Sequence, residues 1–217
     1  MDATRLWFFR HGEVEEPWVG RFIGSTDVGL SPLGRHQAEA IAAYLDPAPI
    51  DAVVSSPRKR ALDTAAPLAR AKGLKLDVRK GLAEMHFGAW EGKSWEDIVA
   101  LDAGHASRWE KDAANTAPPG GGETANAFGE RVASGLEELV AEYKGRSVAV
   151  AAHAGTNRGF LAAILGRPYM EMFSFAQDYG CVNAVGWSGD GGFGQVALLN
   201  FVPGPPSVRH GARKEER

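Results

Sequence analysis

Six short runs of apolar residues recur along the chain, and each has the length of a β-strand. They lie at residues 6–9, 50–56, 74–78, 147–152, 183–187 and 195–202. The first, second and fourth runs are nearly continuous in apolar residues, which is typical of strands that are covered on both faces. The pattern therefore predicts a sheet whose central strands are buried between two layers.

Helical patterns lie between these runs, and their ends carry recognisable signals. Ser31 is a candidate N-cap, followed by a proline at the first helical position. The helix after the second run ends at Gly73, and its internal Pro67 is expected to kink or split it. Ser94 begins a further helix with a capping-box pattern. The longest helical pattern covers residues 123–145, with an apolar stripe along one face.

Strands that alternate with helices predict an α/β protein, a three-layer α/β/α arrangement around a mostly parallel central sheet with right-handed crossovers. Residues 1–202 are expected to form one domain. Residues 203–217 are rich in proline and then in charge, without apolar periodicity, and are expected to form a flexible tail.

Composition narrows the function classes. The chain has 217 residues, 44% of them hydrophobic, and a net charge of −3, so no general attraction to nucleic acid or to an anionic membrane is expected. No apolar stretch approaches the roughly 20 residues that span a bilayer, and the N-terminus does not resemble a secretory signal. The single cysteine, Cys181, excludes an internal disulfide. These features predict a cytoplasmic protein and leave a homodimer open.

The tripeptide Arg-His-Gly occurs twice, at residues 10–12 and 209–211. The first copy follows the first strand, at the sheet edge where open α/β sheets bind ligands. The second lies in the expected tail, where nothing holds a side chain to the sub-ångström tolerance of catalysis. Arg10 and His11 are therefore candidates for chemistry, and the tail copy is a coincidence.

Two further strands are also followed by arginine or histidine residues. The second strand leads into Arg58 and Arg60 at a helix start, and the fourth ends at His153, again before a helix. Helix N-termini and guanidinium groups both bind phosphate. Taken singly, each residue is more commonly a solvated arginine or a loop histidine. Their joint position on three strands that could be adjacent predicts a phosphate-binding site.

Motifs over nearly the whole chain resemble those of the histidine phosphatase (phosphoglycerate mutase-like) superfamily. In chain order they are Arg-His-Gly (10–12), GSTDVGLSPLGRHQAEA (24–40), SSPRKRALDTA (55–65), AEMHFGAWEG (83–92), GGETANAFGERV (121–132) and AHAGTNR (152–158). The resemblance implies the mutase-like three-layer fold, a phosphohistidine intermediate on a small phosphorylated metabolite, and neither a metal nor another cofactor.

The resemblance also assigns roles. His11 would attack phosphorus, and Glu84 would protonate the leaving oxygen and later take a proton from water. The implied catalytic residues are His11, Glu84, His153, Arg10 and Arg58. The implied substrate-binding residues are Arg60, Gly24, Ile23, Ala154 and Arg21. Motif register favours Arg60 as the phosphate contact, whereas a place in the first helical turn favours Arg58, and both stay candidates. Glu91 is expected to be a structural hydrogen-bonding group or a solvated charge.

Two departures favour hydrolysis over mutase activity. Phosphoglycerate mutases carry a basic insertion between the acid and the second histidine, and no basic cluster lies between Glu84 and His153 here. Mutases also place a hydroxyl residue where this chain has Ile23. The compact layout looks most like the α-ribazole phosphatase branch, with an aromatic pocket expected from the residues Trp18, Phe22, Met85, Phe87, Trp90 and Trp109. The alternatives are a phosphoglycerate mutase and a catalytically idle binding member.

Overall fold

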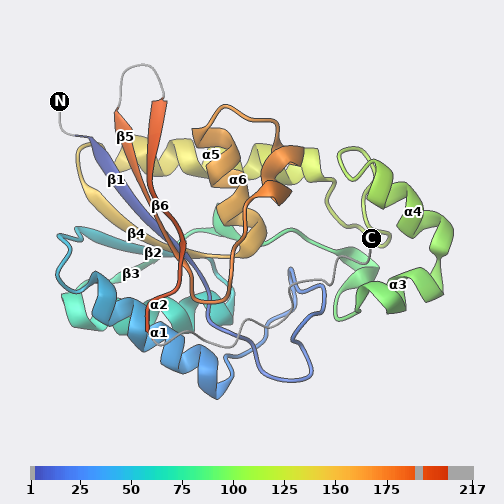
Figure 1. Cartoon of the computed structure of the whole chain (residues 1–217), viewed down its shortest axis with the longest axis horizontal. Helices are drawn as coiled ribbons and strands as arrows, with labels where there is room; N and C mark the ends of the chain where they lie inside the picture. Colours follow the sequence, from blue (N-terminus) through green and yellow to red (C-terminus); the bar gives the residue numbers. More distant parts are fainter. Residues whose placement is uncertain (1–2, 189–192, 205–217) are drawn as a thin grey trace.

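A six-stranded sheet forms the centre of the computed structural model, which describes residues 3–188 and 193–204 (Figure 1). The strands stand in the order β3-β2-β4-β1-β5-β6. Their bounds are β1 Thr4–Arg10, β2 Ala52–Ser55, β3 Leu76–Val78, β4 Ser147–Ala152, β5 Val182–Ser188 and β6 Phe193–Phe201. All six lie where the apolar runs predict strands, with ends shifted by up to two residues.

The sheet is mixed but mostly parallel. Strand β1 pairs in parallel with β4 and antiparallel with β5, β2 pairs in parallel with β3 and β4, and β6 is antiparallel to β5. The three strands expected to carry the chemistry, β2, β4 and β1, are neighbours, so their carboxyl ends meet at one edge. Every residue of β4 is buried, as its continuous apolar run predicts.

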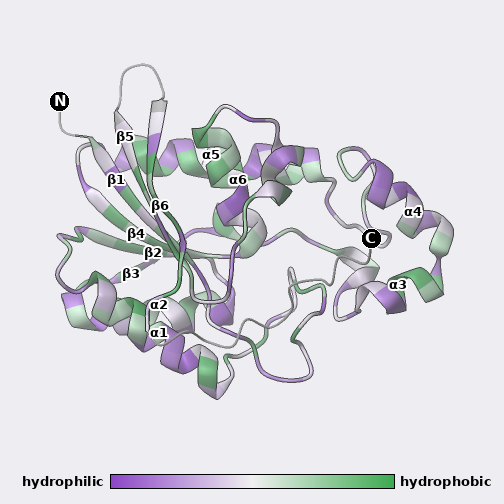
Figure 2. Cartoon of the chain, in the orientation of Figure 1, coloured by the Kyte–Doolittle hydropathy of each residue, from purple (hydrophilic) through white to green (hydrophobic). Residues whose placement is uncertain are grey.

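Helices cover both faces of the sheet. The helices α1 (Pro32–Leu45) and α2 (Lys59–Lys72) lie on one face, and α5 (Ala125–Glu142) and α6 (Ala154–Ile164) lie on the other (Figure 1). Green, hydrophobic residues run along the central strands in Figure 2, whereas the covering helices alternate between green and purple. The predicted three-layer α/β/α architecture is therefore confirmed.

Most of the expected helix ends are also confirmed. The Ser31 hydroxyl accepts a hydrogen bond from the Gly34 N–H, and Gly73 ends α2 in the left-handed conformation, with φ of 64°. Of the two outcomes expected at Pro67, a kink or a split, the split does not occur, because α2 runs unbroken from Lys59 to Lys72. Proline removes one hydrogen bond of the ladder, while buried residues on both sides of it, such as Ala65 and Leu68, hold the helix against the sheet.

The segment between β3 and α5 extends away from the sheet, at the right of Figure 1. It contains two 3₁₀ turns, η1 (Lys80–Leu82) and η2 (Gly88–Trp90), and two short helices, α3 (Trp95–Leu101) and α4 (Ala103–Lys111). The predicted capping box at Ser94 is present. Helix α4 was not expected from the sequence. A third 3₁₀ segment, η3 (Tyr169–Ser174), follows α6.

The second Arg-His-Gly and nearly all of the expected tail lie outside the described residues, so a flexible tail behind a single domain of residues 1–202 stays a prediction. None of the described helices is both long enough and apolar enough to cross a membrane.

Candidate active site

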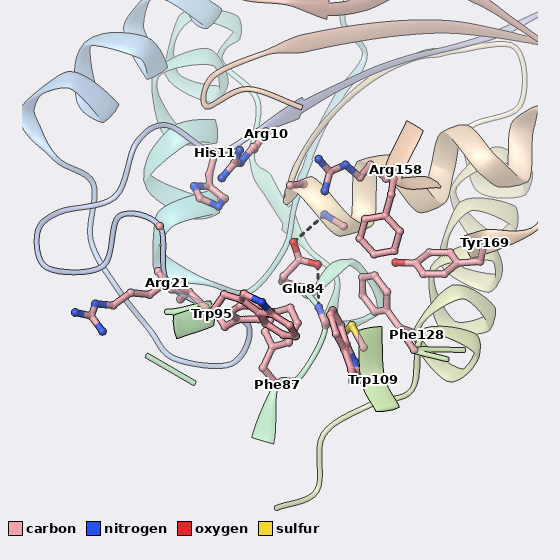
Figure 3. Close-up of a pocket in the computed structure, with 18 of the residues that line it drawn as sticks. Arg10, His11, Arg21, Glu84, Phe87, Trp95, Trp109, Phe128, Arg158 and Tyr169 are labelled. Atoms are coloured by element: carbon pink, nitrogen blue, oxygen red, sulfur yellow. Dashed lines mark hydrogen bonds between the residues drawn. The ribbon is translucent and has the colours of Figure 1, made fainter. Parts of the chain in front are cut away.

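A cavity of about 680 Å³ opens at the carboxyl edge of the sheet (Figure 3). Of the residues assigned roles from the sequence, seven line it: Arg10, His11, Arg21, Ile23, Arg60, Glu84 and Ala154. The structure therefore brings side chains from β1, α2, α6 and the loops between them to one hollow. His153, Arg58 and Gly24 are not among its lining residues.

His11 follows the last residue of β1 and is almost fully buried, with 6% of its surface exposed. Its Nδ1 lies 2.8 Å from the carbonyl oxygen of Gly12. Because a carbonyl only accepts, Nδ1 carries the proton and Nε2 keeps a free lone pair. Burial, with the positive charges of Arg60 and Arg10, holds the pKa of His11 well below its usual value. The imidazole is therefore neutral and nucleophilic near neutral pH.

Arg10 stands beside this histidine and is held from two sides. One terminal nitrogen, Nη1, donates to the carbonyl oxygen of Gln177 at 2.6 Å. The guanidinium carbon lies 3.7 Å from the ring centre of Tyr179, in the geometry of a cation–π contact. The arginine thus faces the cavity as a fixed positive charge.

His153 directly follows β4 and is the N-cap of α6. It has no exposed surface. Its Nε2 lies 2.7 Å from the Ser56 hydroxyl, and its ring centre lies 5.2 Å from that of His11. Burial lowers its pKa well below the usual value, and the charge of Arg60 adds to the effect. The two histidines therefore form a buried neutral pair, of which only His11 lines the cavity.

The two candidate arginines occupy different places. Arg60 is 1% exposed, and its terminal nitrogens donate to the carbonyl oxygens of Ile23, Gly24 and Thr26. Burial lowers its pKa to about 10, so it stays charged. Arg58 is the N-cap of α2, and its buried Nε has no partner in the described part of the chain. Only Arg60 lines the cavity.

The loop that holds Arg60 is itself organised by Glu91. Its carboxylate accepts hydrogen bonds from the backbone N–H groups of Gly24, Ser25 and Thr26, and from two hydroxyls of the same loop. Burial of Glu91 raises its pKa, but these hydrogen bonds outweigh burial and hold the pKa at about 2. Glu91 is therefore a structural carboxylate, one of the two alternatives expected from the sequence.

Glu84 enters the cavity after η1. Its two carboxylate oxygens accept from the N–H groups of Met85 and Gly155, each at 2.9 Å (Figure 3). A Cβ on Gly155 would lie 2.3 Å from the carboxylate, so glycine is required for this approach. The carboxylate is thus anchored in the same cavity that His11 lines.

The Gly-Gly-Glu motif explains how the backbone around Glu84 is fixed. Arg131 pairs with Glu123 at 2.8 Å and donates to the carbonyl oxygens of Gly81 and Ala83. Glu123 also accepts from the N–H of His86, on the other side of Glu84. One ion pair therefore clamps the chain before and after the candidate acid.

Arg21 lines the cavity, whereas Gly24 does not. Arg21 donates to the carbonyl oxygen of Gly92 and pairs with Asp97 at 3.2 Å, so much of its charge is engaged. Gly24 lies so close to the Met85 carbonyl that a Cβ would be 1.8 Å from it. The role of Gly24 is thus close packing and a carbonyl for Arg60, rather than a place in the cavity lining.

Aromatic side chains form much of the cavity wall. Phe22, Phe87 and Trp109 line it, as expected, but Trp90 and Trp18 do not. Trp90 is buried in a small core beneath the wall, because its 3₁₀ turn points it toward α3 and α4. The lining residues that sequence reasoning missed include Trp95, Phe128, Arg158, Tyr169 and Phe173. Phe128 and Arg158 lie within the quoted motifs at residues 121–132 and 152–158, but a motif does not show which of its side chains face the cavity.

No cluster of three or more His, Cys, Asp or Glu side chains suited to a metal ion occurs among residues 3–188 and 193–204. The cations that face the cavity are arginines.

The chain belongs to the histidine phosphatase superfamily (branch 1), whose family model matches residues 6–200. It is 31% identical over 196 residues to the adenosylcobalamin/alpha-ribazole phosphatase of Salmonella typhimurium, covering 90% of this chain and 96% of that protein. A putative alpha-ribazole-5'-P phosphatase structure from Escherichia coli aligns with a TM-score of 0.85 and 28% identity, covering 95% of this chain and 100% of that one.

A bifunctional protein of Mycobacterium tuberculosis is 39% identical over 151 residues, which are 69% of this chain. The match covers 41% of that relative, so the chain corresponds to less than half of its length.

Proposed function

We propose that the protein hydrolyses a small phosphomonoester through a phosphohistidine intermediate. The observation that carries the proposal is the state of His11: Nδ1–H is tied to a carbonyl, Nε2 is free, and burial keeps the ring neutral. Arg10 and Arg60 supply positive charge around the point of attack, and Glu84 lines the same cavity.

In the first step, His11 Nε2 forms a bond to phosphorus while the bond from phosphorus to the leaving oxygen breaks. Glu84 donates its proton to that oxygen, which leaves as an alcohol. Arg10 and Arg60 stabilise the charge on the phosphoryl oxygens. In the second step a water molecule attacks phosphorus, Glu84 takes its proton, and the bond from nitrogen to phosphorus breaks. Inorganic phosphate leaves and His11 regains its lone pair.

Two further features refine the proposal. The aromatic wall supports a leaving group with a flat face, for which α-ribazole 5′-phosphate is the first compound to test. The lack of a basic cluster between Glu84 and His153 supports hydrolysis over phosphoglycerate mutase activity. The intact set of His11 and Glu84 argues against an idle binding member. We propose metal-independent action in the cytoplasm.

Release of phosphate from p-nitrophenyl phosphate tests the activity. His11→Ala removes the nucleophile and is expected to lower kcat at least about 10³-fold. His36, exposed on α1, gives a matched control, because His36→Ala removes an imidazole that does not line the cavity. Acid-labile label from a phosphorylated substrate should appear on the wild-type and His36→Ala proteins and not on His11→Ala. A fully active His11→Ala protein would contradict the proposal.

A further inference from the structure

Arg158 is a cation of the active-site cavity that the proposed reaction does not use. It lies in α6, and its guanidinium points toward the cavity, above Glu84 (Figure 3). Its Nε donates to the carbonyl oxygen of Phe175 at 2.8 Å, which fixes the direction of the side chain. Within residues 3–188 and 193–204, no carboxylate lies within 4.0 Å of it, and its two terminal nitrogens make no hydrogen bond.

A second unused donor belongs to the same wall. Tyr169 lines the cavity, and its ring packs edge-on against Phe128, with ring centres 5.5 Å apart. Its hydroxyl is buried and has no partner in the described part of the chain. Burial raises the pKa of Tyr169 far above its usual value, so the phenol keeps its proton and remains a donor.

Besides the Phe175 carbonyl, the guanidinium of Arg158 has only a distant aromatic contact in the described part of the chain, with its carbon 6.0 Å from the ring centre of Phe173, and the charges around it explain why it lacks an anionic partner. Burial lowers its pKa, and the nearby positive charge of Arg10 lowers it further, while Glu84 opposes both effects. Glu84, however, is already anchored by the N–H groups of Met85 and Gly155. A partly buried cation without a counter-ion is unfavourable unless a ligand supplies one. Guanidinium and phenol both donate here, so that ligand must accept.

We propose that Arg158, assisted by Tyr169, binds a carboxylate on the leaving alcohol of the substrate. The inference rests on the phosphomonoesterase proposal and names a substrate class for the same cavity. Arg10 and Arg60 flank the nucleophile and serve the phosphoryl group, whereas Arg158 offers two parallel N–H groups that match the two oxygens of a carboxylate. α-Ribazole 5′-phosphate has the flat group that suits the aromatic wall but has no carboxylate for Arg158.

Two esters with one carbon skeleton test the inference. In 3-phosphoglycerate, a carboxylate replaces the hydroxymethyl group of sn-glycerol 3-phosphate. The wild-type protein is expected to favour 3-phosphoglycerate in kcat/KM for phosphate release by about tenfold or more. Arg158→Gln should lower this ratio at least about tenfold. Arg158→Lys keeps the charge but loses the pair of parallel N–H groups. Its ratio should lie between those of the wild type and Arg158→Gln.

Arg167→Gln is the matched control, since Arg167 is exposed shortly after the end of α6 and pairs with Glu171 at 3.7 Å. It should leave both rates unchanged. Tyr169→Phe removes one hydroxyl with little change of shape and should lower the ratio modestly. This variant still tests the inference if Arg158→Gln is unstable. An equal ratio in the wild type and Arg158 variants, with both esters hydrolysed, overturns this inference alone. Failure of the wild type to hydrolyse any phosphomonoester overturns the proposed function as well.

Discussion

At the scale of single residues, the site depends on side chains that never touch the cavity. The Glu91 carboxylate accepts hydrogen bonds from the N–H groups of residues 24–26. With the loop held in this way, its carbonyl oxygens accept hydrogen bonds from Arg60. The same carboxylate therefore positions Arg60, the proposed phosphate contact, through the backbone of this loop. The Ser-Ser-x-x-x-Arg-Ala register points to Arg60, but only the loop geometry explains how that buried guanidinium is satisfied.

Replacing Glu91 tests this positioning role. Glu91→Gln puts an NH₂ group against backbone donors, and we expect kcat/KM to fall by about 10- to 100-fold with lower stability. Because the pKa of Glu91 is about 2 in the folded protein and about 4.5 when unfolded, its stabilisation is present above pH 4.5 and is lost as pH falls toward 2. The stability gap between wild type and variant, measured by urea unfolding, should shrink over that window.

Glu96→Gln serves as the control for this substitution, because Glu96 is exposed in the first turn of α3. A Glu91→Gln protein whose stability gap stays constant from pH 5 to pH 3 would contradict the role of the charged carboxylate.

Arg58 and Arg60 can be separated by matched substitutions. Arg60 lines the cavity and Arg58 does not, so Arg60→Gln should lower kcat/KM for p-nitrophenyl phosphate by about 10²-fold or more, and Arg58→Gln by less than about tenfold. Initial-rate kinetics of both variants decide the matter. The opposite order of effects would assign the phosphate to Arg58.

At the scale of elements, the sequence could predict what depends on local pattern. All six strands, the cap at Ser31 and the turn at Gly73 follow from apolar periodicity and backbone preference. Helix α4 has only one buried residue, Ala106, so it offers no apolar stripe to detect. The cavity wall also depends on contacts between segments far apart in the chain, such as that of Tyr169 in η3 with Phe128 in α5, which local patterns do not predict. Arg158 ends the motif at residues 152–158, but the motif alone does not show that its side chain lines the cavity.

The contact between α6 and Glu84 gives a prediction at this scale. A methyl group on Gly155 would sit 2.3 Å from the Glu84 carboxylate, so Gly155→Ala should displace the acid and lower kcat by about 10²-fold. Gly186→Ala is the control, because no atom lies within 4 Å of its added methyl group and its φ is not positive. Steady-state kinetics with circular dichroism would show a folded but impaired Gly155 variant. Equal activity in the two variants would mean that Glu84 has no fixed place in the reaction.

At the scale of the whole molecule, the buried histidine pair links the site to the stability of the fold. Folding carries His11 and His153 into the interior beside Arg60, and the pKa of each falls well below 6.5. The unfolded chain leaves both imidazoles free to take up protons. The burial that keeps His11 neutral therefore makes the stability of the whole fold fall as the pH is lowered.

The sign of the effect follows from proton binding. Below about pH 6.5 the unfolded chain binds protons that the folded protein does not, so the free energy of unfolding should fall by about 1.4 kcal/mol per pH unit for each histidine. Above that pH the pair contributes no slope. Urea unfolding at pH 7.0, 6.0 and 5.5 measures the decline, which precedes the loss of the Glu91 contribution below pH 4.5.

His153→Asn should halve the slope whatever it does to absolute stability, whereas His36→Asn should leave it unchanged. A slope that persists in full without His153 would show that this imidazole takes up a proton in the folded protein, and that the pair is not held neutral by its surroundings.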